Sequence, residues 1–244
     1  MYYLCSEFMA NDYFQFKQFT VYQQRCAMKV GTDGTLLGAW AQVPTESARI
    51  LDIGTGTGLI ALMLAQRFPQ ASVLGIDIDQ DAVCQAKENV ENSPFASRIK
   101  IEHANVMDYN KEEGFDAIVS NPPYFVNSLT CPDDQRTMAR HSVSLTYDGL
   151  MESAFRLLKP EGVFSLVIPS ESRSLLEAAA HLKGFFLSRV CMIRTTPRKQ
   201  PKRQLIEFLK HPVNELCIED GIIEDSPNVR SAWYQQLTQD FYIR

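Results

Sequence analysis

The chain has 244 residues, of which 45% are hydrophobic, and a formal net charge of −5. This length suits one α/β domain, and the acidic balance argues against a protein that coats nucleic acid indiscriminately. The first residues lack the basic and apolar regions of a secretory signal, and no run approaches the ~20 apolar residues of a membrane span. The six cysteines are scattered without a close C-x-x-C pair, and the four histidines are equally dispersed. We therefore expect no disulfide framework, no metal site and a cytoplasmic location.

Strand-like and helix-like segments alternate from residue 49 onward, a pattern typical of a parallel sheet with crossover helices. Aromatic alternation at Phe14, Phe16 and Phe19 predicts a short hairpin before this series. We expect residues 1–45 to form an N-terminal cover and residues 46–244 the main domain, the two together making one structural domain. The expected helices cover residues 34–42, 59–68, 81–92, 146–158 and 170–182. The expected strands cover residues 49–53, 72–76, 99–103, 115–120 and 163–168, followed by an antiparallel terminal pair at 187–194 and 205–209.

A glycine-rich turn, DIGTGTG at residues 52–58, joins the first of these strands to its helix. Its glycines, Gly54, Gly56 and Gly58, allow a tight turn and a close approach of a ligand to the backbone at a helix N-terminus. Their spacing differs from the Gly-x-Gly-x-x-Gly fingerprint of dinucleotide-binding folds. Asp77 ends the second strand, where an acid can accept hydrogen bonds from both hydroxyls of a ribose. Together these features predict a site for a nucleoside-type cofactor.

A proline-rich corner, Asn121-Pro122-Pro123-Tyr124, follows the expected strand 115–120. Two consecutive prolines supply no backbone N–H, and the residue before them is pushed toward an extended conformation. Asn121 and the Pro122 carbonyl can therefore accept two N–H bonds from a planar exocyclic amine, while the Tyr124 ring lies on the attached ring system. Ordinary loop punctuation is the alternative explanation for these dipeptides.

Basic residues are concentrated between Arg189 and Lys210, where seven stand against one acid, Glu207. An acidic protein with one basic patch suits a single docking site for a polyanion. A solvated hairpin tip is the alternative explanation for such a run. The candidate contacts to RNA phosphates are Arg194, Arg198, Lys199, Lys202 and Arg203.

The glycine turn, the acid at the end of the second strand and the Asn-Pro-Pro-Tyr corner, in this order, resemble the class I S-adenosylmethionine-dependent methyltransferases that act on planar amino nitrogens. The segments FQFKQF (14–19), MKVGTDG (28–34) and LLGAW (36–40) resemble the tRNA1(Val) adenine-37 N6-methyltransferases more closely. The resemblance implies a Rossmann-like class I methyltransferase fold, with a mostly parallel central sheet and helices on both faces. It also implies S-adenosyl-L-methionine as the cofactor and N6-methylation of adenine in tRNA, with adenine 37 of tRNA1(Val) as the expected target.

The resemblance also assigns residues to the cofactor. Asp52 and the glycine turn would lie by its methionine end, under a cover that includes Lys29, Thr32 and Asp33. Asp77 would lie by the ribose, and Asn105 stands where the family usually has an Asp contacting adenine. The expected cofactor-binding residues are thus Lys29, Thr32, Asp33, Asp52, Gly54, Gly56, Gly58, Asp77, Ile78, Asn105 and Asn121.

The expected catalytic residues are Asn121, Pro122 and Tyr124. The first two would hold the adenine amine by its N–H groups, and Tyr124 would stack on the base once it is turned out of its helix or loop. No strong general base is needed, because the alkylated ammonium is very acidic. The polar segment 127–140 that follows is either a lid or a plain connection.

Other planar amines remain open as targets: guanine N2 in ribosomal RNA, adenine N6 in DNA and glutamine N5 in protein. A chain of this size has little room for the added target-recognition region of DNA enzymes, and the first 45 residues lack the helical pattern of the glutamine enzymes. A non-catalytic scaffold that binds cofactor or RNA would need no amine-polarising corner. We therefore expect tRNA as the partner of a monomer that binds no membrane and no metal.

Overall fold

The computed structural model of the chain describes residues 12–26, 28–123 and 145–243. Tyr124 and the segment 127–140 lie outside these described residues. The helices are α1 (Thr32–Trp40), α2 (Leu59–Arg67), α3 (Gln80–Glu91), α5 (Tyr147–Leu157), α6 (Arg173–Lys183) and α7 (Ala232–Thr238), with 3-10 turns at Ala96–Arg98 and Ser170–Ser172. The strands are β1 (Tyr13–Gln15), β2 (Thr20–Tyr22), β3 (Arg49–Ile53), β4 (Ser72–Asp77), β5 (Ile99–His103), β6 (Phe115–Ser120), β7 (Leu158–Pro169), β8 (Phe186–Arg194), β9 (Arg203–Leu209), β10 (Cys217–Ile222), β11 (Glu224–Ser226) and β12 (Val229–Arg230). Among the described helices, none is long and apolar enough to cross a membrane.

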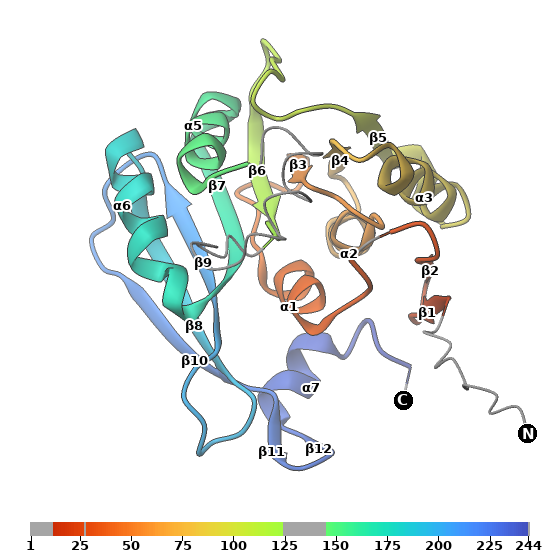
Figure 1. The fold of residues 1–244 in the computed structure, drawn as a ribbon, viewed down its shortest axis with the longest axis vertical. Helices are drawn as coiled ribbons and strands as arrows, with labels where there is room; N and C mark the ends of the chain where they lie inside the picture. Colours follow the sequence, from red (N-terminus) through yellow and green to blue (C-terminus); the bar gives the residue numbers. More distant parts are fainter. Residues whose placement is uncertain (1–11, 27, 124–144, 244) are drawn as a thin grey trace, which may run out of the picture.

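The large central sheet has the strand order β10-β8-β9-β7-β6-β3-β4-β5, and helices cover both of its faces (Figure 1). Neighbouring strands run parallel except where β9 lies between β7 and β8, antiparallel to both. The expected fold class, a mostly parallel sheet with an antiparallel pair, is therefore confirmed. Because β3 to β7 run in one direction, their carboxyl ends share one edge of the sheet, which we call the carboxyl edge.

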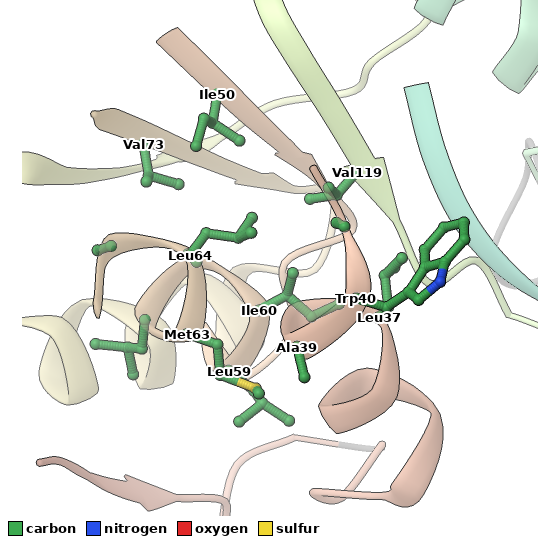
Figure 2. Packing of buried hydrophobic residues seen from close by; sticks show 14 of the residues in the cluster. Leu37, Ala39, Trp40, Ile50, Leu59, Ile60, Met63, Leu64, Val73 and Val119 are labelled. Carbon is green, nitrogen blue, oxygen red and sulfur yellow. The ribbon is translucent and has the colours of Figure 1, made fainter. Parts of the chain in front are cut away.

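The sheet is buried on both faces because helices pack on each of them, and successive side chains of a strand point to opposite faces. Ile50 and Val119 belong to a core with α1, α2, α3 and α7. Their chain neighbours Leu51 and Ile118 belong to a second core with α5 and α6. Figure 2 shows Ile50 and Val119 pointing from the sheet toward the side chains of α1 and α2. Burial on both faces explains why these strands appear in the sequence as continuous apolar runs.

Two glycines allow α1 to pack closely against α2. A Cβ at Gly38 would lie 2.7 Å from Sδ of Met63, and one at Gly34 would lie 3.1 Å from Cδ2 of Leu59. Leu59 is the first residue of α2, directly after the glycine turn. The close packing therefore brings the first turn of α1 to the carboxyl edge of the sheet.

The expected N-terminal hairpin is present as the antiparallel pair β1–β2. Phe16 is almost fully buried, and its ring centroid lies 4.8 Å from that of Phe19 and 5.8 Å from that of Tyr242. Residues near the two ends of the chain thus share one aromatic cluster. The division of the chain at residue 45 stays a prediction.

Strand β7 and the strands that follow β9 differ from the sequence-based expectation. The expected strand 163–168 begins earlier, because Leu158 already pairs with Phe115 across a register shift in the β6–β7 ladder. Strand β10 lies in an acidic stretch for which we expected no strand, and it pairs in parallel with β8. Arginines of β8 compensate the acids of β10, since Arg194 forms an ion pair with Asp220 at 3.2 Å.

Candidate active site

The glycine turn between β3 and α2 opens onto the carboxyl edge. Gly54, Gly56 and Gly58 have φ values of 70°, 55° and 81°, in the left-handed region that favours glycine. A Cβ at Gly54 or Gly56 would meet no atom within 4 Å, whereas one at Gly58 would lie 3.4 Å from Cβ of Ala86 in α3. The first two glycines therefore face open space that a ligand can enter, and the third allows α3 to pack against the turn.

Asp52 of β3 stabilises this turn through a hydrogen bond. Its side chain is fully buried, and Oδ2 accepts a hydrogen bond of 2.7 Å from the Thr55 hydroxyl. Burial raises the pKa of Asp52 to about 7, while the Thr55 hydroxyl acts in the opposite direction and the neighbouring Asp77 carboxylate adds to the rise. The Asp52 carboxyl group is thus placed to shape the turn, and a bound cofactor would meet the turn itself.

Asp77 stands beside the turn at the end of β4. Its carboxylate is partly buried and accepts the N–H groups of Gly56 at 2.8 Å and of Asp79 at 3.0 Å. The next side chain, Ile78, is 58% exposed. A carboxylate and an exposed apolar side chain next to an open glycine turn fit a nucleoside cofactor, with the carboxylate for ribose hydroxyls and the apolar surface for a base.

Asn105 follows β5, the strand next to β4, and takes part in a local turn. Its Oδ1 accepts the N–H of Met107 at 3.1 Å, and its Nδ2 donates to the Asp108 carboxylate at 3.1 Å. The register pairs Asp77 with His103, so the two strands end together at the carboxyl edge. The structure therefore brings Asn105 to the same edge as Asp77 and Ile78, with its amide oxygen engaged by the backbone.

Asn121 follows β6 at the carboxyl edge. Its Nδ2 lies 4.0 Å from Sδ of Met28 and would lie 3.9 Å from a Cβ at Gly34. The Ser120 hydroxyl donates to the Ile53 carbonyl at 2.9 Å, which ties the end of β6 to the end of β3. Pro122 is buried and Pro123 exposed, and Tyr124 lies outside the described residues. The corner thus sits between the glycine turn and the first turn of α1.

The residues expected to cover the cofactor, Lys29, Thr32 and Asp33, lie in the chain between Met28 and Gly34. The Lys29 ammonium donates to the Gln23 carbonyl, and Thr32 is the first residue of α1. The Asp33 carboxylate forms an ion pair with the Arg203 guanidinium at the start of β9. Sequence reasoning placed Asp33 with the cofactor and Arg203 with RNA, and the structure brings the two side chains together.

The five basic candidates fall into two groups. Arg194 pairs with Asp220 and Arg203 with Asp33, so both guanidinium groups have carboxylate partners. Arg198, Lys199 and Lys202 are exposed in the β8–β9 loop and form no ion pair with the described residues. This loop lies at the carboxyl edge, because the register pairs Arg203 with the last residue of β7.

Sequence reasoning missed two features near the site. Met28 and Gly34 lie beside Asn121, and the fully buried Asn89 of α3 donates to the Thr57 carbonyl of the glycine turn at 2.8 Å. The available signal for Asn89 was its position: it is a polar residue on the buried face of α3, which it shares with Gln85 and with the apolar Val83, Ala86 and Val90. The signal for Gly34 was its place at the start of an apolar helix.

Comparison with known proteins relates this geometry to a family. Residues 32–186 match the methyltransferase small domain family. A protein of Phocaeicola vulgatus named tRNA1(Val) (adenine(37)-N6)-methyltransferase is 52% identical over 235 residues, which cover 96% of this chain and 99% of the relative. The chain belongs to the tRNA1(Val) (adenine(37)-N6)-methyltransferase family. The family expected from the sequence motifs is thus confirmed, over more of the chain than the motifs span.

Solved structures support the fold alone. A predicted O-methyltransferase from Agrobacterium tumefaciens superposes with a TM-score of 0.68 at 20% identity, covering 86% of this chain and 96% of that one. A putative class I S-adenosylmethionine-dependent methyltransferase from Listeria monocytogenes gives a TM-score of 0.57 at 16% identity, covering 77% and 62%. Both likenesses agree with the class I methyltransferase fold.

Proposed function

We propose that the protein transfers a methyl group from S-adenosyl-L-methionine to N6 of adenine 37 in tRNA1(Val). One structural relationship carries the proposal, together with the name of the relatives. The register pairs Ile53 of β3 with Ser120 of β6, so Gly54 and Asn121 leave neighbouring parallel strands at the same level. Adjacent strands lie roughly 4.8 Å apart, so a cofactor on the turn would lie beside the corner that holds the amine.

The residues of the corner address the weak nucleophilicity of the target. The lone pair of an adenine N6 amine is delocalised into the ring, and a carbonyl or amide oxygen that accepts an N6–H bond favours its localisation on nitrogen. Asn121 Oδ1 and the Pro122 carbonyl would provide two such acceptors and aim the lone pair. The cofactor supplies a methyl group activated by a sulfonium sulfur. With the amine held in this way, its lone pair would take the methyl group as the bond from that carbon to sulfur breaks; S-adenosylhomocysteine would then leave and one N6 proton would pass to water.

We propose the remaining roles from the positions of the described residues and, for Tyr124, from the sequence. The turn at Gly54 and Gly56 would take the methionine end of the cofactor, Asp77 the ribose, and Ile78 with Asn105 the adenine. Tyr124 would stack on the target base. Arg198, Lys199 and Lys202 would contact phosphates of the tRNA. We further propose that the protein acts as a monomer in the cytoplasm and that residues 1–45 form the cover of the cofactor site.

Cofactor binding can be tested separately from RNA. Calorimetry with S-adenosyl-L-methionine should show binding to the wild type and binding about 1–3 kcal/mol weaker to Asp77→Ala, because ribose hydroxyls would lose their charged acceptor. A wild type that does not bind S-adenosyl-L-methionine, or that binds NAD tightly instead, would overturn the cofactor.

The substrate is tested with labelled S-adenosyl-L-methionine and total tRNA from a strain that lacks the gene. Nuclease digestion and mapping should place N6-methyladenosine at position 37 of tRNA1(Val). N2-methylguanosine as the product, or labelled glutamine in protein, would keep the amine chemistry and overturn the substrate. Absence of transfer to any of these, with the cofactor bound, would favour a scaffold.

A further inference from the structure

A buried amide joins the glycine turn to the N-terminal part of the chain. Asn89 in α3 is 0% exposed, and all three of its hydrogen bonds are 2.8 Å long. Its Oδ1 accepts the N–H of Tyr22, and its Nδ2 donates to the carbonyls of Tyr22 and Thr57. One side chain thus holds the backbone of two segments that lie 35 residues apart, because Thr57 belongs to the glycine turn and Tyr22 to β2.

Tyr22 begins the segment that leads to the corner. We call residues 22–26 and 28–31 the strap, because these described residues lead from the end of β2 to the first turn of α1. Gln85, one turn before Asn89 on the same face of α3, is 1% exposed and accepts the N–H of Arg25 at 3.3 Å. The Gln23 side chain accepts the N–H of Val30 at 2.7 Å, which closes the strap on itself. Two amides of α3 and one amide of the strap therefore fix its path.

The strap ends beside the catalytic corner. Sδ of Met28 lies 4.0 Å from Nδ2 of Asn121, and the strap also carries Lys29 of the expected cover. A shift of the strap relative to the glycine turn would therefore change the space between the turn, the cover and Asn121. The Asn89 side chain touches both the strap and the turn.

We propose that Asn89 is a positioning residue that sets the strap at the distance from the glycine turn at which the cover fits the methionine end of the cofactor. The proposal rests on the proposed placement of the cofactor. Burial of an amide among apolar side chains is unfavourable unless its polar atoms are hydrogen-bonded, and both Nδ2 hydrogens and Oδ1 of Asn89 are bonded to backbone groups of two segments. A residue that served only the packing of α3 would need no such group.

The test uses Asn89→Asp, which keeps the size of the side chain and the acceptor for Tyr22. The substitution removes both N–H donors and places a carboxylate oxygen against two carbonyls. We expect the Kd for S-adenosyl-L-methionine to rise about 10-fold, which corresponds to about 1.4 kcal/mol, because the strap would no longer be held at its distance from the glycine turn. We also expect faster hydrogen exchange at the amides of Tyr22, Arg25 and Val30, with an unchanged Kd for tRNA.

The control is Asn92→Asp at the end of the same helix. Asn92 is exposed, and among the described residues its Nδ2 donates to the Glu88 carbonyl one turn earlier in the same helix. The control should leave the cofactor Kd and the exchange of the strap at wild-type values. If Asn89→Asp does not fold, Gln85→Met provides a second test. This substitution keeps a similar side-chain volume but removes the acceptor of the Arg25 N–H, and it should also raise the cofactor Kd.

The two failures can be told apart. If the wild type binds S-adenosyl-L-methionine and the folded Asn89 and Gln85 variants bind it equally well, the positioning role is wrong and Asn89 only stabilises the fold. If the wild type does not bind the cofactor, the proposed function is wrong. A rise in the tRNA Kd as large as the rise in the cofactor Kd would also contradict the inference, because it would indicate a general disturbance.

Discussion

The Arg203 guanidinium and the Asp33 carboxylate form an ion pair that joins the start of β9 to the first turn of α1. Both side chains are largely buried, with exposed fractions of 26% for Arg203 and 14% for Asp33. The carboxylate also lies at a helix N-terminus, where negative charge is stabilised. The pair therefore connects the basic β8–β9 loop, the proposed cover and, through Gly34, the side of the catalytic corner.

Replacement of Arg203 by Met should reveal this connection. The Met side chain keeps an apolar stem but removes the guanidinium that pairs with the Asp33 carboxylate, so we expect a loss of about 1–3 kcal/mol in the free energy of unfolding. Urea denaturation measures the loss, and Lys199→Met in the exposed loop should change it by less than about 0.5 kcal/mol. A cycle with Asp33→Asn should show coupling between the two sites, and additive effects would contradict a direct interaction.

Removal of the exposed basic side chains of the β8–β9 loop should weaken RNA binding without changing cofactor binding. A triple Ala variant of Arg198, Lys199 and Lys202 should bind tRNA more weakly and with a flatter salt dependence, because fewer counterions are released. Its Kd for S-adenosyl-L-methionine should not change. The charge-matched control replaces Lys87, Lys100 and Lys111, which lie outside the β8–β9 loop. Equal salt slopes for the triple variant and the wild type would place the docking surface elsewhere.

Asn121→Ala should separate chemistry from binding. The variant loses one of two proposed acceptors for the amine, so we expect kcat to fall roughly 10²–10³-fold. Cofactor binding should persist, since the change affects the side of the site that faces the amine. Asn121→Asp retains an acceptor oxygen and should lose less activity than Asn121→Ala. Single-turnover kinetics with saturating tRNA measures the effect, and full activity of the Ala variant would exclude the mechanism.

The buried Asp52 should make stability depend on pH. Burial raises the pKa of its carboxyl group to about 7, above the ~3.9 of an exposed Asp, so the folded state keeps a proton that the unfolded state releases in this interval. Its contribution to the free energy of unfolding therefore falls as the pH rises from about 4 to 7. Asp52→Asn removes this titration, and its stability relative to the wild type should rise over the same interval in urea denaturation.

Asp116 provides a control, because its contribution to stability should depend on pH in the opposite direction. Burial alone would raise the pKa of Asp116, but the Arg49 N–H and the Lys159 ammonium hold it below the ordinary value. Its contribution is therefore present at neutral pH and is lost as the pH falls below about 4. Asp116→Asn should be most destabilising near neutrality. Parallel pH profiles for the two Asn variants would show that the Asp52 carboxyl is not held in its protonated form.

The part of the site that depends on strand order could be predicted from the sequence. Glycine turn, strand-end acid and proline corner each follow an apolar strand, and the carboxyl ends of parallel strands meet at one edge. The bounds of β3, β5 and β6 agree with the expected ranges 49–53, 99–103 and 115–120.

Contacts between distant segments could not be predicted. Asp33 and Arg203 meet only because β9 enters the sheet beside β7, which no local pattern indicates. Strand β10 has an acidic composition that disfavours a strand, and in the sheet two of its acids form ion pairs with arginines of β8. Asn89 looks like an ordinary helix residue until β2 and the glycine turn are placed against it.

The position of β9 has a consequence for synthesis on the ribosome. Strand β8 is made before β9 but reaches the sheet only through it, since the order is β8-β9-β7. Until residue 209 has been made, β7 therefore presents an unpaired edge, and β8 has no partner in the rest of the sheet. Exposed strand edges promote association between chains. A nascent or truncated chain that ends in the β8–β9 loop should thus aggregate, although it already contains the glycine turn and the proline corner.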